Sequence, residues 1–372
     1  METNRTKSGS QILAVALSGG VDSSVAAYLL AGEWKQPGEG RGMVGVSHYI
    51  WPGSQSCNEE TIRRAESVCR TIGIPFHRVD MVDRFTRCVV DDFVATYLRG
   101  ETPNPCVRCN ERMRFGAFYR QLEELLDGGK GGGKRLYFAT GHYVRTVRRN
   151  GRWFLRRGAD SDKDQSYMLY KIDPKLLPML RFPLGEYTKY EVVAIAKRAG
   201  LPAASVKESQ DICFIDGSYP DFIRNYSTAE EGNIVDTAGR VLGTHRGYIH
   251  YTIGQRKGLG LSNGPWYVVR VDAESNTVVV GRRDECAVTT FSISETNWFI
   301  SPPEKPLSCS VKIRYNSPDI PCTVREQAGA AEVVLETEAA VTPGQSAVFY
   351  DDEVLLGGGI IRRQPPNTGA GN

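Results

Sequence analysis

The sequence predicts an α/β protein with an N-terminal doubly wound, Rossmann-like parallel sheet, a small mixed central domain and a C-terminal β-barrel. Apolar runs of strand length alternate with helical patterns in the first part of the chain, which is typical of a parallel sheet. Short β-like segments separated by glycine begin near Ser218, and alternating strand patterns fill the last part. The 372 residues allow two or three domains. We predict them at 10–217, 218–281 and 282–364.

Strands and helices are expected to alternate over the first domain. The expected strands are residues 12–17, 43–49, 75–82 and 135–140. The expected helices are residues 22–32, 59–72, 84–98, 113–126 and 189–199. Ligands of such sheets bind at the carboxyl ends of the strands. We therefore expect residues 18–24, 48–51 and 139–143 to share one rim.

The remaining chain has the texture of β-structure. In the central domain the expected strands are residues 246–251, 266–271 and 277–280. In the barrel they are residues 309–315, 322–324, 331–335, 346–350 and 353–356. The glycine and lysine run at 128–133 predicts a surface loop, and residues 365–372 a frayed tail.

Composition excludes several classes of protein. No apolar run approaches the ~20 residues that a membrane helix needs. The first residues lack the apolar core of a signal peptide, so we expect a cytoplasmic protein, monomeric when free. Nine cysteines in such a chain indicate reduced thiols rather than a disulfide framework. The net charge of +3 carries no argument about nucleic acid.

The string L-S-G-G-V-D-S-S at residues 17–24 reads as a phosphate loop. A strand that runs through glycines into a helix presents backbone N–H groups and a positive helix end to an anion. The loop lacks the spacing and the lysine of the P-loop, which disfavours transfer of a terminal phosphate. Asp22 would repel a phosphate unless a cation lies between them, so we infer Mg²⁺ there. Alternatively, Asp22 only caps the helix.

The loop resembles that of the PP-loop ATP pyrophosphatase superfamily. Within it, the chain is similar to the tRNA-specific 2-thiouridylase (MnmA) family. The strings that carry this resemblance are T-P-N-P-C-V-R-C-N (102–110), A-T-G-H-Y (139–143), K-D-Q-S-Y (163–167), D-I-C-F-I (211–215), G-Q-R-K-G-L-G (254–260) and T-P-G-Q-S-A-V-F-Y (342–350). The resemblance implies an enzyme that uses ATP and Mg²⁺ to adenylate O2 of the wobble uridine in Lys-, Glu- and Gln-type tRNAs. Sulfur then replaces the oxygen, giving 2-thiouridine, AMP and pyrophosphate.

The resemblance also assigns roles to residues of this chain. It implies ATP binding by Ala16, Leu17, Ser18, Gly19, Gly20, Val21, Asp22, Ser23, His48 (where many members have methionine) and Gly141. It implies contact with a flipped target base by Asn104, Pro105 and Cys106. It implies contact with tRNA by His142, Lys163, Asp164, Gln165, Arg314, Tyr315 and Gln345.

Two cysteines are implied to be catalytic. Cys213 carries a persulfide delivered by a sulfur-donor protein, and Cys109 is the nucleophile that ends in a disulfide with it. The flanking Pro103-Asn104-Pro105 predicts an exposed, rigid turn around Cys109. The other thiols are expected to be small apolar groups in the interior, namely Cys57, Cys69, Cys88, Cys286, Cys309 and Cys322.

The chain departs from a common form of the family at Cys106, where many members have an aspartate assigned to acid/base work. The resulting C-x-x-C pair could, with Cys213, ligate a [4Fe–4S] cluster that leaves one iron open for sulfur. A redox dithiol, or a zinc site with a fourth ligand, is a further alternative. The plain persulfide mechanism and the cluster-dependent one both stay open.

Residues 145–157, R-T-V-R-R-N-G-R-W-F-L-R-R, interleave arginines with Trp153 and Phe154. This run predicts either an edge hairpin with a solvated face or a surface for RNA phosphates and bases. Two rival functions remain. One is another adenylating PP-loop enzyme, and the other is a non-catalytic tRNA-binding or sulfur-carrier protein that has kept the loop.

Overall fold

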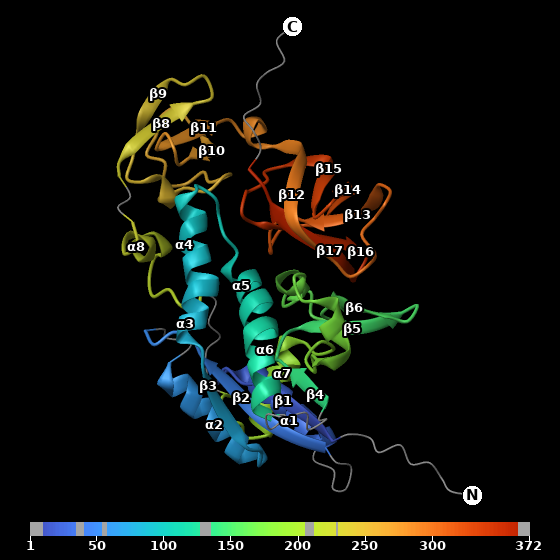
Figure 1. Ribbon diagram of the computed structural model, residues 1–372. Coiled ribbons are helices and arrows are strands. Elements are labelled where there is room, and N and C mark those ends of the chain that lie inside the picture. The colour runs from blue at the N-terminus through green and yellow to red at the C-terminus, as the bar shows by residue number, and fades with distance from the viewer. Residues whose placement is uncertain are drawn as a thin grey trace, which may run out of the picture. The chain divides into compact units, whose positions relative to one another are not determined.

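The computed structural model describes residues 10–34, 41–53, 58–126, 135–204, 212–227 and 230–363. The chain divides into two compact units. The first contains Met1–Cys88 and Cys109–Phe214, and the second contains Val89–Arg108 and Ile215–Asn372. Figure 1 labels their elements. Cys57 and the predicted segments at 128–133 and 365–372 lie outside the described residues.

The first unit is built on a parallel sheet, as predicted. Its strand order is β3-β2-β1-β4-β7. The bounds are β1 (Gln11–Ala16), β2 (Arg41–Tyr49), β3 (Phe76–Asp80), β4 (Arg135–Ala139) and β7 (Leu180–Arg181). Neighbouring strands run parallel, with Ile12 opposite both Gly42 and Leu136. Four consecutive buried residues in β1 show that both faces of the sheet are covered.

Helices cover the two faces of this sheet. The long helices of the unit are α1 (Val21–Trp34), α2 (Glu59–Ile72), η2 (Cys109–Phe118), α6 (Tyr119–Leu126) and α7 (Lys189–Arg198). On one face, Leu13 packs in a cluster with Leu30 of α1 and Val68 of α2. On the other, Phe138 contacts the rings of Phe115 and Phe118 of η2, and Figure 1 shows α6 running across this side of the strands. The fold is therefore doubly wound.

The helix that carries the two thiols of the C-x-x-C pair begins earlier than predicted. Pro105 is the first residue of α5 (Pro105–Arg108), and Asn104 caps it by accepting a hydrogen bond from the Val107 backbone N–H at 3.2 Å. Proline fits the first helical position because the backbone N–H that it lacks would have no intrahelical partner there. The expected exposed turn around Cys109 is therefore wrong. Cys109 instead opens the ten-residue π-helical segment η2.

The predicted helix at 84–98 is also interrupted by a π-helical turn. It consists of α3 (Val82–Phe85), the π-helical η1 (Thr86–Val90) and α4 (Asp91–Leu98). Such turns are rare and widen a helix locally. In contrast, α2 has the predicted bounds, because Asn58 caps its start and Gly73 ends it with a left-handed φ of 68°.

Residues 145–157 form the predicted hairpin. Its strands are β5 (Val144–Arg149) and β6 (Arg152–Arg157). Asn150 and Gly151 form the tip with φ values of 48° and 79°, as a two-residue turn between twisted strands requires. Further short elements of this unit are η3 (Ser166–Leu169) and η4 (Pro174–Met179).

The second unit contains a mixed sheet and a closed barrel. After α8 (Tyr219–Arg224), the mixed sheet has the order β10-β11-β8-β9. Its strands are β8 (Gly232–Asp236), β9 (Val241–His245), β10 (Tyr267–Asp272) and β11 (Thr277–Gly281). The strand expected at 246–251 is wrong, since that segment forms the 3-10 turn η5 (Tyr248–His250) after Gly247 with φ 115°. A second 3-10 turn, η6 (Asp284–Cys286), precedes the barrel.

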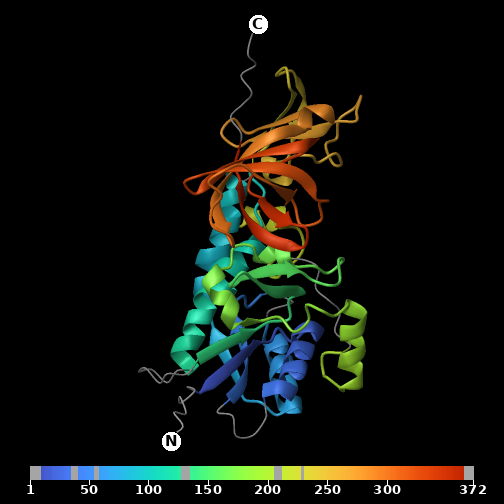
Figure 2. The same ribbon diagram turned by 90° about the vertical axis from the view of Figure 1, so that its right-hand side faces the viewer.

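The barrel is antiparallel and has six strands. They are β12 (Val288–Trp298), β13 (Leu307–Lys312), β14 (Ile320–Gln327), β15 (Ala330–Ala339), β16 (Ser346–Asp351) and β17 (Val354–Ile361). Their order is β12-β15-β14-β13-β16-β17, and pairing of β12 with β17 closes the ring, whose curvature Figure 2 shows in orange and red. Five of these strands were predicted, and β12 was missed. None of the described helices is both long and apolar enough to cross a membrane.

Phe138 gives a test of the core of the first unit. It is fully buried and contacts three aromatic rings. Phe138→Ala should lower the free energy of unfolding by about 3–5 kcal/mol, because it removes apolar contacts and leaves a cavity. Tyr190→Ala is the control, since that side chain on α7 is 84% exposed and its loss should change little. Urea titration followed by fluorescence measures both; equal effects of the two variants would contradict this packing.

Candidate active site

The phosphate loop joins β1 to α1. Gly19 has a left-handed φ of 72°, and a Cβ there would lie 2.4 Å from the carbonyl oxygen of Thr61. The Ser18 backbone N–H donates to Ser23 Oγ at 3.1 Å, and Ser24 Oγ donates to the Gly20 carbonyl at 2.7 Å. These bonds hold the loop against the first turn of α1, whose positive end faces it. The backbone is therefore shaped for an anion, and only glycine fits at position 19.

A cavity of about 160 Å³ opens beside this loop. Seven of the predicted ATP-binding residues line it, namely Ala16, Leu17, Ser18, Asp22, Ser23, His48 and Gly141. Two predicted tRNA contacts, His142 and Gln165, also line it, as do Arg114 and Thr140, for which no role was predicted. The segments at 18–24, 48–51 and 139–143 thus share one rim, as expected. The segment after β4 can lie this close to the start of α1 only with glycine at position 141, since a Cβ there would lie 2.8 Å from the Ser23 nitrogen.

The loop has no lysine of its own, but a lysine of α7 contacts it. Lys189 Nζ lies 2.7 and 2.8 Å from the two carboxylate oxygens of Asp22, and Tyr143 Oη donates to the same carboxylate at 2.8 Å. The hydrogen bonds of the Asp22 carboxylate therefore go to side chains rather than to the helix backbone. Nothing in the loop points to Lys189, because the two residues are 167 positions apart. The site thus holds an acidic and a basic side chain, whereas the sequence indicated only the acidic one.

His142 is held as a neutral imidazole by its two neighbours. Its Nε2 lies 3.1 Å from Arg114 Nη1, and its Nδ1 lies 2.7 Å from Thr140 Oγ1. A guanidinium only donates, so Nε2 accepts and Nδ1 carries the proton that it donates to Thr140. Burial, followed by the charge of Arg114, lowers the pKa of His142 well below its ordinary value. The same two causes lower the pKa of His48 to about 3. Both rings are uncharged at neutral pH.

Cys109 and Cys213 are half-buried cysteines of the first unit. The residue after Cys109 is anchored, since Asn110 Nδ2 donates to the Met168 carbonyl at 3.2 Å and Asn110 Oδ1 accepts from Arg114 at 2.9 Å. The residue after Cys213 is anchored by packing, since the buried Phe214 contacts two aromatic rings. These rings are Trp51, just after β2, and Phe85 of α3, with centroids 6.2 and 5.5 Å away.

Cys106 belongs to the second unit and is exposed on α5. Among the residues that the structure describes, no three His, Cys, Asp or Glu side chains come together as a metal site. The cluster ligated by Cys106, Cys109 and Cys213 therefore stays a hypothesis.

Most of the remaining cysteines behave as the predicted small apolar groups. Cys69 and Cys286 are buried, and desolvation raises their pKa values to about 12 and about 11, so both remain thiols at neutral pH. Cys322 is buried in the barrel opposite the half-buried Cys309, with the two sulfur atoms 3.7 Å apart. Cys88 is also only half-buried.

Several predicted tRNA contacts already have partners within the chain. Asp164 is buried and accepts hydrogen bonds from the backbone N–H groups of Gly158 and Ser166. Gln345 Nε2 donates to the carbonyls of Thr102 and Pro103, both at 3.0 Å. In the same way, side chains of Gln165 and Arg314 bond to the backbone of Tyr143 and Ile253. Each of these four side chains holds a loop of its own unit, and contact of the four residues with tRNA stays a prediction.

Comparison with known proteins identifies the family of this chain. The family model described as the tRNA methyl transferase HUP domain matches residues 11–217, the PRC-barrel domain of the same series matches 220–282, and the aminomethyltransferase beta-barrel domain matches 288–361. A protein of Acidithiobacillus ferrooxidans named tRNA-specific 2-thiouridylase MnmA is 44% identical over 357 residues, covering 94% of this chain and 97% of that protein.

The chain belongs to the MnmA family of tRNA-specific 2-thiouridylases. Members of the same name from Synechococcus sp. and Geobacter metallireducens are 43% and 42% identical, covering 95% and 96% of this chain and 98% of each relative. Among solved structures, it is similar to U34-tRNA thiolase NcsA from Methanococcus maripaludis with its [4Fe–4S] cluster (TM-score 0.35, 20% identity, 58% of this chain and 64% of that chain). NMN synthetase from Francisella tularensis matches with TM-score 0.33 and 15% identity, over 54% of this chain and 67% of that chain. These two likenesses are too distant to support an inference.

Membership of a PP-loop family implies ATP and Mg²⁺ as ligands, and this unit fits ATP at the loop. Lys189→Met should lower the affinity for ATP with Mg²⁺ about tenfold, because the buried side of the site loses its positive charge. Lys197→Met, on the exposed face of the same helix, is the matched control and should bind as wild type. Isothermal titration measures both; unchanged affinity in Lys189→Met would show that this lysine serves the fold alone.

The buried His48 predicts acid sensitivity of the first unit. Its pKa is about 3 in the folded chain against an ordinary 6.5. Between these two pH values the unfolded chain binds a proton that the folded chain does not bind. The resulting stabilisation is complete above about pH 6.5 and is lost as the pH falls towards about 3. His48→Met should therefore lose less unfolding free energy between about pH 7 and pH 4 than wild type. His77→Met, at an exposed position of β3, controls for loss of an imidazole. Parallel pH profiles for all three proteins would contradict this role of burial.

Proposed function

We propose that this chain is a tRNA uridine 2-sulfurtransferase. It adenylates O2 of the wobble uridine with ATP and Mg²⁺ and then replaces that oxygen by sulfur, which gives 2-thiouridine, AMP and pyrophosphate. The observation that carries the proposal is identity of 42–44% with 2-thiouridylases along nearly the whole chain. An intact phosphate loop and two half-buried thiols in one unit support it and disfavour the non-catalytic alternative.

The loop residues are proposed to hold ATP for attack at its α-phosphorus. Backbone N–H groups at residues 18–23 bind the phosphates, and the cavity beside His48 and Gly141 takes the adenosine. Mg²⁺ on the Asp22 carboxylate would lower the charge of the departing pyrophosphate. Since Lys189 occupies both oxygens of that carboxylate in the free chain, the metal requires Lys189 to turn away. The lysine then lies close enough to contact a phosphate itself.

The two thiols are proposed to transfer sulfur in two steps. The terminal sulfur of a persulfide on Cys213 bonds to C2 of the activated uridine, and the C2–O bond breaks so that AMP leaves with its electron pair. The Cys109 thiolate then attacks the Cys213 sulfur, and the bond to the transferred sulfur breaks, leaving that electron pair on 2-thiouridine. Cys109 and Cys213 end as a disulfide, which a cellular thiol must reduce before the next turnover.

Cys106 distinguishes two versions of this chemistry. In the plain version it faces the target base together with Asn104 and Pro105. In the other, Cys106, Cys109 and Cys213 would hold a [4Fe–4S] cluster, which would supply an iron with an open position for sulfur. The observation that keeps the second version is the C-x-x-C spacing with its exposed first thiol.

The remaining parts of the proposal concern partners and organisation. The chain takes tRNA as substrate and receives persulfide sulfur from a donor protein, and it is monomeric and cytoplasmic when free. Residues 10–217 form the ATP-binding catalytic domain, residues 218–281 the central domain and residues 282–364 the tRNA-contacting barrel. The residues proposed for tRNA contact are His142, Lys163, Asp164, Gln165, Arg314, Tyr315 and Gln345.

Thiol variants test the function and its two versions together. The protein is purified without oxygen, its iron content is measured, and 2-thiouridine formed in tRNA is quantified by mass spectrometry of nucleosides. Cys213→Ser and Cys109→Ser should each lower the yield at least a hundredfold, because each removes a sulfur that forms or breaks a bond. Cys286→Ser, at a buried thiol outside the site, should thiolate as wild type.

Cys106→Ala decides between the versions. An iron-free protein that thiolates normally excludes the cluster, whereas loss of both iron and activity in Cys106→Ala supports it. Full activity of Cys213→Ser would refute the persulfide role. A wild-type protein that adenylates tRNA but incorporates no sulfur would refute the proposed function.

A further inference from the structure

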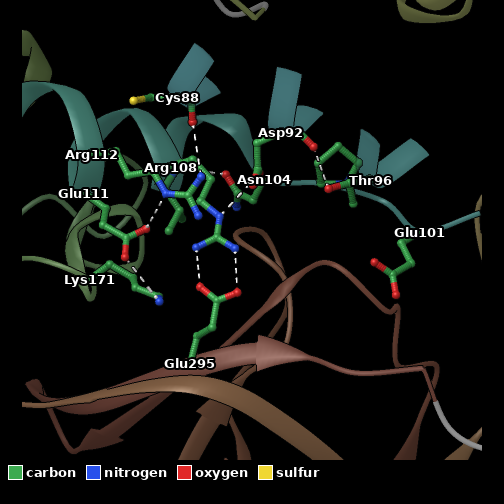
Figure 3. A network of polar contacts seen from close by, with 12 residues as sticks. Cys88, Asp92, Thr96, Glu101, Asn104, Arg108, Glu111, Arg112, Lys171 and Glu295 are labelled. Atoms are coloured by element: carbon green, nitrogen blue, oxygen red, sulfur yellow. Dashed lines mark hydrogen bonds and ion pairs between the residues drawn. The ribbon is translucent and has the colours of Figure 1, made fainter. Parts of the chain in front are cut away.

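Arg108 is the charged residue inside the T-P-N-P-C-V-R-C-N string, between Cys106 and Cys109. Its guanidinium binds Glu295 of β12 through two parallel hydrogen bonds, Nη1 to Oε2 at 2.6 Å and Nη2 to Oε1 at 2.9 Å (Figure 3). Its Nε also lies 3.4 Å from Asp92 of α4. The Arg108 side chain is only 10% exposed. All three residues belong to the second unit.

Glu295 has an unusual backbone for this contact. Its φ is 50°, in the left-handed region where non-glycine residues are strained. It lies where the pairing of β12 with β17 shifts register between Ser294 and Asn297. Such a bulge re-aims one side chain of a strand. Here the re-aimed side chain is the carboxylate that binds Arg108, so a strained backbone is kept where glycine would be unstrained.

α5 is the first turn of a helical run that continues directly into η2 and α6. Contacts outside this run hold the turn at its start. A second attachment to the barrel side lies just before it, where Thr102 N–H donates to the Pro343 carbonyl and Gln345 holds the Thr102 and Pro103 carbonyls. A cavity of about 400 Å³ adjoins the segment and is lined by Asn104, Arg108 and Glu295. One anchor thus precedes the proposed target-base residues, and the Arg108–Glu295 pair follows them.

We propose that the Arg108–Glu295 pair is a positioning device for sulfur transfer. It fixes the orientation of α5, and with it Asn104 and Cys106, by locking Arg108 in this first helical turn to the barrel. This inference rests on the proposed function. Two parallel hydrogen bonds between a guanidinium and a carboxylate fix the orientation of the two groups as well as their distance. Lysine or a shorter acid cannot reproduce this geometry. Neither side chain touches a reacting atom, so both act through the residues that they orient.

Arg108→Lys and Glu295→Gln keep a hydrogen bond but lose the fork, and Glu295→Gly loses the pair while relieving the left-handed backbone. Each variant should thiolate about tenfold more slowly in single turnover, since small errors in orientation cost rate. The KM for ATP should stay unchanged, because the nucleotide cavity lies in the first unit. The double variant Arg108→Lys with Glu295→Gln should be no slower than the slower single variant.

Two further measurements separate positioning from stability. Glu326→Gln is the matched control, since Glu326 accepts hydrogen bonds from Thr296 and Trp298 in the same barrel; it should lower the unfolding temperature without slowing thiolation. Glu295→Gly should also unfold at a lower temperature, because Arg108 loses its main partner, but its slowing should exceed that of Glu326→Gln at an equal loss of unfolding temperature. Hydrogen exchange at the Val107 and Arg108 amides, which Asn104 caps, should speed up several-fold in the three single variants.

The outcomes are distinct. Wild-type thiolation in Glu295→Gly, or slowing that follows the unfolding temperature across all variants including Glu326→Gln, overturns the positioning role. If the wild-type chain forms no 2-thiouridine, the proposed function fails. The exchange experiment then still reports whether the pair fixes α5, and unchanged exchange would overturn that part by itself.

Discussion

The Asp22–Lys189 ion pair is the interaction on which the nucleotide site depends. It joins the first turn of α1 to the first turn of α7, and the Tyr143 hydroxyl ties the rim after β4 to the same carboxylate. Apolar packing continues this junction, with Val25 and Ala26 of α1 against Val192 and Ala196 of α7. A partly buried carboxylate next to a phosphate loop would be costly alone, and the lysine offsets that cost in the free chain. The same pair supplies a carboxylate for a metal and an ammonium group for a phosphate.

The thiol segment shows a second constraint, which is the need to orient the first turn of a helix. Asn104 and Pro105 start α5 at no cost in backbone hydrogen bonds, and the nearly buried Arg108 pairs with Glu295. Directly afterwards the chain enters a π-helical segment in which Arg114 donates to Asn110 Oδ1 and contacts His142 Nε2. Asn104 and His142, for which base and tRNA contact is predicted, thus already have hydrogen-bond partners within the chain.

The sequence predicts the sheet and its rim well, because a strand buried on both faces is a continuous apolar run and its carboxyl end is fixed by the direction of the chain. It fails at α5, where Asn-Pro was interpreted as a turn although the same pair can cap a helix. It also fails at Lys189 and Glu295, whose roles arise from residues 167 and 187 positions away. The sequence-based predictions also missed the π-helical turns and the strands β8, β9 and β12. No local pattern encodes an ion pair between distant elements, so such residues become visible only in the structure.

The central claim is that one ATP and one persulfide sulfur are consumed for each uridine converted to 2-thiouridine. The most direct test loads Cys213 with a single labelled persulfide, adds tRNA and ATP, and counts products in one turnover. One AMP, one pyrophosphate and one labelled 2-thiouridine per loaded chain, with a Cys109–Cys213 disulfide in the spent protein, is the expected result. Label that enters tRNA without release of pyrophosphate, or a spent protein in which Cys109 and Cys213 remain thiols, would contradict it.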